Sequence, residues 1–185
     1  MLKESYKEAE TRMKGAIQAL EEDLGGIRTG RASPALIERM QIEYYGTPTP
    51  LIQLATISVP EPRSLLIRPF DASSLKSIER AILASDLGLT PNNDGKSIRL
   101  NLPPLTEERR RELVKVVHNR VEEARVAARN VRRDSIRDLR EFMQEKMISE
   151  DELKRGEDEL QKITDQYIEE INVIGERKEK EILEV

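Results

Sequence analysis

One stretch of the sequence decides the fold: TEERRRELVKVVHNRVEEARVAARNVRRDSIRDLREFMQEKMI, which runs from Thr106 to Ile148. Its apolar residues recur at steps of three and four, the spacing that gives an α-helix one apolar face. Thr106 is the predicted N-cap, and the carboxylates of Glu107 and Glu108 follow in the first turn, where they favour the helix dipole. The stretch therefore predicts a helix of about 42 residues, roughly 60 Å long at about 1.5 Å per residue. Its apolar stripe consists of Val114, Val117, Val121, Ala124, Ala128, Val131, Leu139 and Phe142.

Two other segments show the same helical periodicity, one before this stretch and one after it. The first predicts a helix of about 27 residues, with the stripe Leu2, Tyr6, Ala9, Met13, Ala16, Leu20, Leu24 and Ile27. The second begins with a capping box, Ser149 to Glu152, and its stripe continues through Leu153, Leu160, Ile163, Tyr167, Ile171 and Ile174. Because one amphipathic helix cannot bury its stripe alone, three of them predict a long antiparallel three-helix bundle.

The chain between Gly30 and Thr106 has a different composition, since all 9 prolines fall here and the apolar runs are short. Three runs predict strands: IERMQIEYY from Ile37, SLLIRPF from Ser64 and KSIRLNL from Lys96. Glycine and proline set their boundaries: Gly46 with Pro48 and Pro50, then Pro60 and Pro62, then the turn NNDG at Asn92 to Gly95. A helix is predicted from Ser74 to Leu87, with Gly88 as its C′ residue.

This pattern predicts a two-domain α+β fold in which a small α/β sandwich is inserted between the first two long helices. Residues 1–30 and 106–185 are expected to form the bundle, and residues 31–105 the inserted domain. Two chain crossings join these domains, one at Thr29 and Gly30 and one at Pro103, Pro104 and Leu105. Because proline restricts φ while glycine loosens the backbone, we expect a two-strand hinge of limited range, with a single rigid body as the alternative.

The composition excludes most catalytic chemistry. With no cysteine there is no disulfide, no thiolate nucleophile and no cysteine-based zinc or iron–sulfur site. The only histidine, His118, gives no basis for a catalytic triad or a histidine-rich metal site, and a lone histidine on a helix surface is typically solvated. We therefore expect no catalytic residue, no metal and no cofactor.

One short motif, DGKS at Asp94 to Ser97, resembles the end of a phosphate-binding loop. That loop needs a glycine five residues before Gly95, where the sequence has Thr90. It also needs a helix where the sequence predicts a strand. Nucleotide binding is therefore not expected.

The first twenty residues mix charges throughout and lack the apolar segment of a signal peptide. No run of apolar residues is long enough to span a membrane as a helix. The sequence therefore favours a cytoplasmic protein without a membrane partner.

A weakly acidic total hides two segments of opposite charge. The formal net charge is −4, from 31 Lys and Arg against 35 Asp and Glu. The segment from Thr106 to Ile148 carries 12 basic and 9 acidic residues, whereas the segment from Ser149 to Val185 carries 6 and 13. Since phosphate contacts depend on the local patch and not on the sum, the total does not exclude a nucleic-acid partner.

The basic residues of the long central helix share one sector of its surface. At about 100° per residue they fall within a sector roughly 100° wide, beside the apolar stripe. They are Arg111, Lys115, His118, Arg125, Arg129, Arg132, Arg133 and Arg140. Arginine predominates, and its planar guanidinium suits bidentate contact with phosphate. Three interpretations remain open: contact with RNA or another polyanion, ion pairs with the acidic third helix, or solubility alone.

A rigid rod with one basic edge favours double-helical RNA, whose recognition relies on backbone and shape. Aromatic residues make up only 3% of the chain, so few can stack on bases. Tyr44 and Tyr45 are adjacent and alternate sides of a strand, so at most one can face a partner while the other packs inward. Single-strand binding on aromatic platforms is therefore disfavoured.

Six motifs closely resemble the bacterial ribosome recycling factor family, in the same order and at the same separations. They are IRTGRASP at Ile27 to Pro34, EYYGTPTPL at Glu43 to Leu51, ASDLGL at Ala84 to Leu89, LPPLTEERR at Leu102 to Arg110, ARVAARNVRRD at Ala124 to Asp134 and ISEDE at Ile148 to Glu152. The resemblance spans the chain. It implies a three-helix bundle with a smaller α/β domain between its first and second helices, in an L-shaped molecule of roughly transfer-RNA dimensions. We expect this molecule to be a monomer.

The resemblance also implies a translation factor and its partners. Such a factor binds the post-termination ribosome and, with elongation factor G and GTP, promotes its splitting into subunits for new initiation, with initiation factor 3 involved in the release that follows. We expect the basic edge of the bundle to dock on large-subunit ribosomal RNA while the translocase pushes against the hinged domain. The factor itself hydrolyses nothing, so we do not expect an enzyme.

The resemblance assigns RNA contact to individual arginines: Arg110, Arg129 and Arg132, with Arg133 beside them and Arg28 and Arg31 at the joint. Arg132 is the strongest single candidate. Arg129 and Arg132 lie within about 60° of one another on the helix, whereas Arg110 lies at the edge of the basic sector. Departures from the family pattern concentrate in the acidic third helix and at Ser135, Ile136 and Arg137, and none touches the arginines.

Two other classes of protein stay open. A helical scaffold would show apolar residues outside the bundle stripe and little salt dependence. A nuclease or transferase would need a convergent polar cluster, for example carboxylates with a metal. The sequence shows neither feature.

Overall fold

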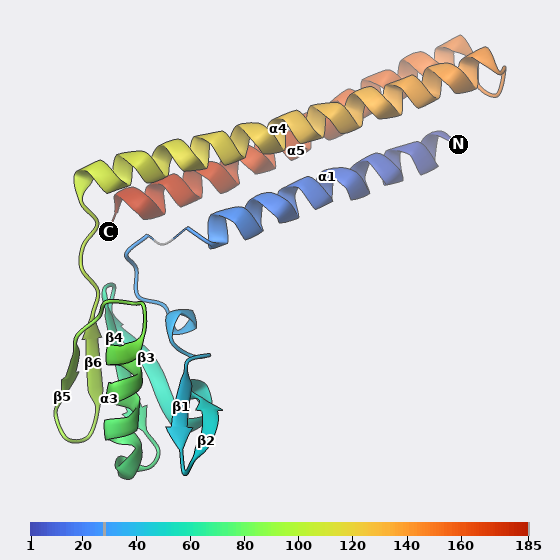
Figure 1. The fold of residues 1–185 in the computed structure, drawn as a ribbon. Coiled ribbons are helices and arrows are strands. Elements are labelled where there is room, and N and C mark those ends of the chain that lie inside the picture. Colours follow the sequence, from blue (N-terminus) through green and yellow to red (C-terminus); the bar gives the residue numbers. More distant parts are fainter. Residues whose placement is uncertain (28, 185) are drawn as a thin grey trace. The chain divides into compact units, whose positions relative to one another are not determined.

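Three helices with continuous apolar stripes form the first of two units (Figure 1). They are α1 (Leu2–Gly25), α4 (Glu107–Gln144) and α5 (Glu150–Leu183). The structure, a computed structural model, describes residues 1–27 and 29–184. Its second unit, Thr29–Thr106, contains β-sheet and short helices. The predicted α+β fold class is therefore confirmed.

The bundle is antiparallel, as predicted. Leu2 at the start of α1 and Leu139 near the end of α4 both lie beside Gly156 near the start of α5. The helix α4 therefore runs opposite to both α1 and α5, and Figure 1 shows the three helices side by side.

The bundle core is built from small and branched side chains. Its buried apolar residues are Ala9, Met13, Leu20 and Leu24 of α1, Leu113, Val117, Val121, Ala124, Ala128, Val131 and Leu139 of α4, and Leu160, Ile163, Tyr167, Ile171 and Ile182 of α5. The predicted α4 stripe differs at its ends, because Val114 and Phe142 are only half-buried while Leu113 is buried. At about 100° per residue Leu113 projects like Val131, whereas Val114 lies about 100° further round, beside the basic sector.

Two buried glycines let α5 approach α4 closely. A Cβ at Gly156 would lie 2.7 Å from Cδ1 of Leu139, and one at Gly175 would lie 2.5 Å from Cγ2 of Val121. Leu139 can adjust the far end of its flexible side chain. Val121 is β-branched and nearly fixed at χ1 in a helix, so the contact at Gly175 is the less adaptable of the two.

The turn between α4 and α5 begins earlier than predicted. Helix α4 ends at Gln144 and not at Ile148, because Lys146 is left-handed with a φ of 60°. The Met147 N–H donates to the carbonyl of Phe142 at 2.8 Å, the bond that closes such a helix end. At the other end of the long helices, α1 stops at Gly25, short of the predicted Ile27.

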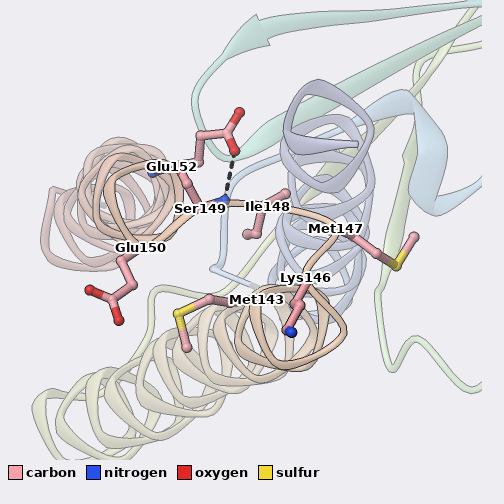
Figure 2. Close-up of a pocket in the computed structure, with 7 residues that line it drawn as sticks. All are labelled: Met143, Lys146, Met147, Ile148, Ser149, Glu150 and Glu152. Atoms are coloured by element: carbon pink, nitrogen blue, oxygen red, sulfur yellow. Dashed lines mark hydrogen bonds between the residues drawn. The ribbon is translucent and has the colours of Figure 1, made fainter.

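The predicted capping box at the start of α5 is confirmed (Figure 2). The Ser149 N–H donates to Oε2 of Glu152 at 2.8 Å, and the Glu152 N–H donates to Oγ of Ser149 at 3.1 Å. Hydrogen bonding to Ser149, and above all the bond from its backbone N–H, holds the pKa of Glu152 below its ordinary value. The N-cap role predicted for Thr106 on α4 stays a prediction.

The second unit contains two antiparallel sheets. One pairs β1 (Gln41–Tyr44) with β2 (Thr47–Pro50). The other has the order β3-β4-β6-β5, with β3 (Ala55–Glu61), β4 (Ser64–Pro69), β5 (Pro91–Asn93) and β6 (Ile98–Asn101). Four short helical segments complete the unit: η1 (Pro34–Leu36), α2 (Leu51–Leu54), η2 (Ala72–Ser74) and α3 (Leu75–Ala84).

The core of this unit lies on one face of the four-stranded sheet. Helix α3 supplies Leu75, Ile78 and Ile82, while the central strands supply Leu65, Ile67, Ile98 and Leu100. Because successive side chains of a strand alternate between faces, Leu66, Arg68 and Arg99 belong to the opposite face. That face is more exposed, with Arg68 open to solvent and the other two half-buried.

The predicted strand boundaries in this unit are wrong where proline was taken as a strand terminator. Pro48 and Pro50 lie inside β2, and Pro60 lies inside β3. β2 pairs with β1 alone among the described strands, so one of its edges has no partner strand. Backbone N–H groups two residues apart point to the same edge, so both prolines can occupy positions where no ladder hydrogen bond is needed. Pro60 falls in the irregular pairing between Ser58 and Glu61.

The predicted helix from Ser74 to Leu87 is shorter in the structure. It ends at Ala84, where the hydroxyl of Ser85 donates to the carbonyl of Ile82 at 2.6 Å. Gly88 is left-handed, with a φ of 64°, but it lies in the turn beyond the helix and is not its C′ residue.

Candidate nucleic-acid interface

The basic sector of α4 borders α5. Four of its side chains reach polar groups there: His118 to Glu179, Arg125 to Asn172, Arg132 to Gln161 and Arg140 to Glu157. The sequence left open whether this sector pairs with the third helix or binds a polyanion. The structure shows the interhelical pairs, and further cations lie beyond them on the exposed side of α4.

Arg132 is held by a neutral partner. Its Nη1 donates to Oε1 of Gln161 at 2.6 Å, and Nε2 of Gln161 donates to Oδ1 of Asp165 at 2.8 Å. The Arg132 side chain is half-buried. Because an amide oxygen accepts a hydrogen bond without neutralising the donor, the guanidinium is fixed in direction and keeps its positive charge.

Arg129 and Arg133 are exposed, and their partners lie on α4 itself. Nη1 of Arg129 lies 3.3 Å from the carboxylate of Glu122, which also binds Nη1 of Arg125 at 3.1 Å. Hydrogen bonds from Arg125 and then from Arg129 lower the pKa of Glu122. Arg133 donates to the amide oxygen of Asn130. One carboxylate thus serves two guanidiniums and an amide serves a third, which leaves the region positive.

Arg129, Arg132 and Arg133, termed the arginine cluster below, lie around one hollow. This hollow has a volume of about 270 Å³, and Val126 and Asn130 complete its lining. A neighbouring hollow of about 480 Å³ is lined by Arg132, Arg133, Ile136, Arg137, Arg140 and Gln161. Several guanidiniums converge here on space open to solvent, an arrangement that can hold phosphate oxygens through charge-assisted, forked hydrogen bonds.

The opposite flank of α4 carries acidic residues and faces α1. Asp134 binds Arg12 of α1 at 2.9 Å and Arg137 at 3.5 Å. The hydrogen bond from Arg12 is the main reason why the pKa of Asp134 lies below its ordinary value. Asp134 is therefore engaged on a different flank from the arginine cluster, whereas Glu122 is the α4 carboxylate that pairs with Arg129 of the cluster.

Arg110 lies far from the cluster. It precedes Arg129 by 19 residues on one helix, which corresponds to about 28 Å along the axis. Its Nη1 donates to the carbonyl of Leu183 at 3.2 Å, and its buried Nε has no hydrogen-bond partner among the described residues. A guanidinium at this position stabilises the C-terminal end of α5.

The predicted hinge residues all lie in the second unit. Thr29 is buried, Pro103 and Pro104 are exposed, and Gly30 has a φ of 80°, a left-handed conformation that favours glycine. Leu105 is half-buried. The predicted hinge itself stays a prediction.

Both chain crossings are tied to one turn. The Ala32 N–H donates to the carbonyl of Pro62, and the Leu102 N–H donates to the carbonyl of Arg63, each at 2.8 Å. Pro62 and Arg63 are adjacent residues between β3 and β4. Ala32 on one side and Leu102 on the other are therefore both held to this turn of the inserted unit.

The two arginines predicted at the joint have different outcomes. Arg28 lies outside the described residues. Arg31 is exposed, and its side chain has no ion pair or hydrogen bond with the rest of the chain as far as the structure describes it.

Sequence reasoning missed the neutral residues of α5 that orient the basic sector. It named carboxylates of the third helix as partners, whereas Gln161 and Asn172 accept hydrogen bonds from Arg132 and Arg125. A signal was present, because these two residues are 11 positions apart, about three helical turns, and so share a face.

The described residues contain no group of three or more His, Cys, Asp or Glu that could hold a metal ion. No helix among them is both long enough and apolar enough to cross a membrane.

The chain is similar to ribosome recycling factors over its full length. The family profile described as "Ribosome recycling factor" matches residues 20–183. Relatives with that name include those of Symbiobacterium thermophilum at 55% identity, Roseiflexus castenholzii at 55% and Halalkalibacterium halodurans at 56%, each over 185 residues and all of both chains.

Two solved structures are also similar. A solution structure of the ribosome recycling factor matches with a TM-score of 0.72 and 49% identity, over 100% of this chain and 98% of that one. The other contains the T. thermophilus ribosome recycling factor and the E. coli elongation factor G bound to the E. coli post-termination complex. It matches with a TM-score of 0.62 and 49% identity over 99% of both chains.

Proposed function

Because the chain belongs to the ribosome recycling factor family, we propose that it binds the post-termination ribosome and, with elongation factor G and GTP, promotes its splitting into subunits for new initiation. Similarity over the whole chain supports this function, as does the related factor found with elongation factor G on a post-termination complex. Initiation factor 3 acts in the release of messenger and transfer RNA that follows.

The arginine cluster of α4 is the contact with large-subunit ribosomal RNA in this proposal. The observation that carries it is Arg132, whose guanidinium is held by neutral Gln161 and remains charged. Binding phosphate therefore does not require breaking an ion pair at this residue. Arg110 contributes near the end of the bundle, and Arg28 and Arg31 contribute at the joint.

The two crossings act as a hinge against which elongation factor G pushes. The Ala32 and Leu102 ties to Pro62 and Arg63 hold the inner ends of both crossings in the inserted unit, and the proposed hinge residues are Thr29 and Gly30 on one side and Pro103, Pro104 and Leu105 on the other. Short stretches containing proline allow a swing of limited range and transmit force better than a long flexible linker does.

In this proposal the factor binds and transmits force, and its partner carries out the chemical reaction. Elongation factor G hydrolyses the GTP, and the factor itself catalyses no reaction and uses no metal or cofactor. It works as a monomer in the bacterial cytoplasm, where its partner ribosomes are.

Light scattering of post-termination ribosomes tests the function. We expect scattering to fall when this protein, elongation factor G and GTP are all present, and to stay constant when any one of them is omitted. Co-sedimentation at increasing salt should show steep weakening of binding, because counterions are released from RNA phosphates. Absence of binding at low salt would contradict the proposal.

A loosened joint tests the hinge separately. The double variant Pro103→Gly/Pro104→Gly should bind ribosomes like the unmodified protein and split them more slowly, because the second crossing then transmits less force. Replacing the exposed Pro48→Gly in β2, which ties neither crossing, gives a proline control. Normal splitting by the double variant would contradict the hinge.

A further inference from the structure

The face of the four-stranded sheet that α3 does not cover carries two arginines without partners. Arg99 on β6 pairs with Leu66 on β4, and Arg68 lies two residues further along β4. The two arginines are thus diagonal neighbours, about 7 to 8 Å apart. Neither side chain has a hydrogen bond or ion pair with any residue that the structure describes, although Arg99 is half-buried.

The two arginines line a hollow in which no neighbouring side chain that the structure describes forms a hydrogen bond or ion pair with them. The hollow has a volume of about 310 Å³, and its lining also includes Leu66, Asn92, Asn93, Asp94 and Ser97. The carboxylate of Asp94 is engaged in its own turn, because Oδ1 accepts the N–H groups of Lys96 at 2.9 Å and Ser97 at 2.7 Å. Oδ2 accepts the hydroxyl of Ser97 at 3.0 Å. The charges of Arg68 and Arg99 are therefore available to an external anion.

We propose that this sheet face, defined by Arg68, Arg99, Asn92 and Leu66, binds the phosphate backbone of RNA as a contact separate from the arginine cluster of α4. The inference rests on the proposed function, which places the chain on a particle rich in RNA. Two guanidiniums at diagonal positions can each form forked hydrogen bonds with a phosphate, and no internal pair has to break first. The Asn92 amide lies directly across the ladder from Arg99 and adds a neutral donor.

RNA fits this face better than an acidic protein does. Strong protein contacts centre on aromatic, methionine or arginine anchors, and of these residue types the face offers arginine alone. The ladder positions on this face supply Thr56, Ser58, Glu61, Ser64, Leu66, Arg68, Asn92, Arg99 and Asn101, with no aromatic residue or methionine among them. A polar, cationic surface of this kind is suited to contacts with the sugar–phosphate backbone, which need no base stacking.

A charge-matched pair of variants tests the face. Arg68→Gln/Arg99→Gln should lower the affinity for vacant ribosomes roughly tenfold at moderate salt. It should also reduce the slope of log affinity against log salt by about 1.5, because two phosphate contacts are lost. Arg39→Gln/Arg80→Gln removes two exposed, unpaired arginines elsewhere in the same unit and should change neither quantity. Far-UV circular dichroism should be unchanged in both variants.

A tethered cleavage probe identifies the partner. The chain has no cysteine, so Thr56→Cys, on the strand position paired with Arg68, can carry a single iron chelate that generates hydroxyl radicals. Cleavage of ribosomal RNA by the bound, labelled protein supports the proposal.

Two results overturn the inference while the proposed function stands. One is unchanged affinity and salt slope in Arg68→Gln/Arg99→Gln when the unmodified protein binds and splits ribosomes. The other is loss of affinity without RNA cleavage from the label, which would identify a protein surface as the partner. Failure of the unmodified protein to bind ribosomes would instead reject the proposed function, and this inference with it.

Discussion

The arginines of the bundle and those of the inserted unit differ in how the structure holds them. Every arginine side chain of α4 has a hydrogen-bond or ion-pair partner within the described chain, as Arg125 with Asn172 and Arg140 with Glu157 illustrate. The arginine side chains of the second unit have none among the described residues: Arg31, Arg39, Arg63, Arg68, Arg80 and Arg99.

This difference separates two ways of presenting positive charge. A guanidinium fixed during folding has already lost its rotamer freedom, so a ligand meets it in place. A free guanidinium loses about 0.5 to 1.5 kcal/mol of side-chain entropy when it is immobilised on binding. We therefore expect the bundle to supply the strong, position-specific contact and the inserted unit to supply weaker contacts that depend more on salt.

The largest loss of ribosome affinity should come from substituting Arg132, one of the α4 arginines that have partners within the chain. Arg132→Ala should weaken ribosome binding about 100-fold, because charge-assisted hydrogen bonds contribute roughly 1.5 to 3 kcal/mol each. Titration of ribosomes with labelled protein measures this affinity. Helicity should be unchanged, since the lost internal bond joins two side-chain tips and no backbone group of either helix.

Arg120→Ala provides the control for this substitution. Arg120 lies on the same helix and pairs with Glu123 at 3.2 Å, away from the cluster. The Arg120→Ala variant should bind ribosomes as tightly as the unmodified protein does. Equal losses in both variants would mean that total charge, and not the fixed position of Arg132, governs binding.

The next effect concerns the close approach that brings α5 to the basic sector. Gly175→Ala should lower the free energy of unfolding by about 1 to 3 kcal/mol, because its Cβ would collide with Val121. Gly15 occupies an exposed position of α1 with open space around it, so Gly15→Ala should raise that free energy by up to about 1 kcal/mol. Urea unfolding measures both. Stabilisation by both substitutions would show that α5 can move away from α4 without cost.

A smaller effect should follow from removing the partner that orients Arg132. Gln161→Leu should weaken ribosome binding about fivefold, since the guanidinium keeps its charge and loses its fixed direction. Gln166→Leu, an exposed position on the same helix, is the matched control. If Gln161→Leu bound as tightly as the unmodified protein, fixed and free arginines would be equivalent as ligands.

The smallest effect is a shift of carboxyl pKa values with salt. Arginine hydrogen bonds lower the pKa of Glu122 and Asp134, whereas backbone N–H groups are the main cause of the lowered pKa values of Asp71 and Asp94. Adding about 1 M salt should raise the first two pKa values toward ordinary ones and leave the last two nearly unchanged. Carboxyl carbon chemical shifts during an acid titration measure all four.

The sign of the stability effect follows from these directions. Each group has a lower pKa in the folded protein, so its contribution is present above its unfolded pKa of about 4 and is lost as pH falls through the folded value. Unfolding should therefore become easier in acid below about pH 4. A salt response of equal size in all four carboxyls would contradict the different causes assigned to them.

The helical unit could be predicted from sequence because its signals are local and repeated. Steps of three and four residues located all three long helices, and the Ser149 to Glu152 spacing located the start of α5. The small sheet gave weaker signals. β5 has three residues and β2 consists of TPTP, so their identity as strands depends on neighbours that are distant in sequence.

The site was predictable in its residue types but not in its pairings. Helical spacing placed Arg129 and Arg132 in one sector, and the structure places both around one hollow. That Gln161 holds Arg132 depends on the axial register of α4 against α5. This register is set by buried contacts such as that of Gly175 with Val121, which no local pattern encodes.

The ties of Ala32 and Leu102 to adjacent residues of one turn also bear on how the chain folds. Helix α1 is synthesised first, yet its partners α4 and α5 come only after the whole inserted unit. If the inserted segment were disordered, forming the bundle would require bringing its two distant ends together. That loop closure costs entropy, which would lower the stability of the bundle. Once the inserted unit has folded, its two ends already emerge side by side, so the bundle closes as if a short connection joined α1 to α4.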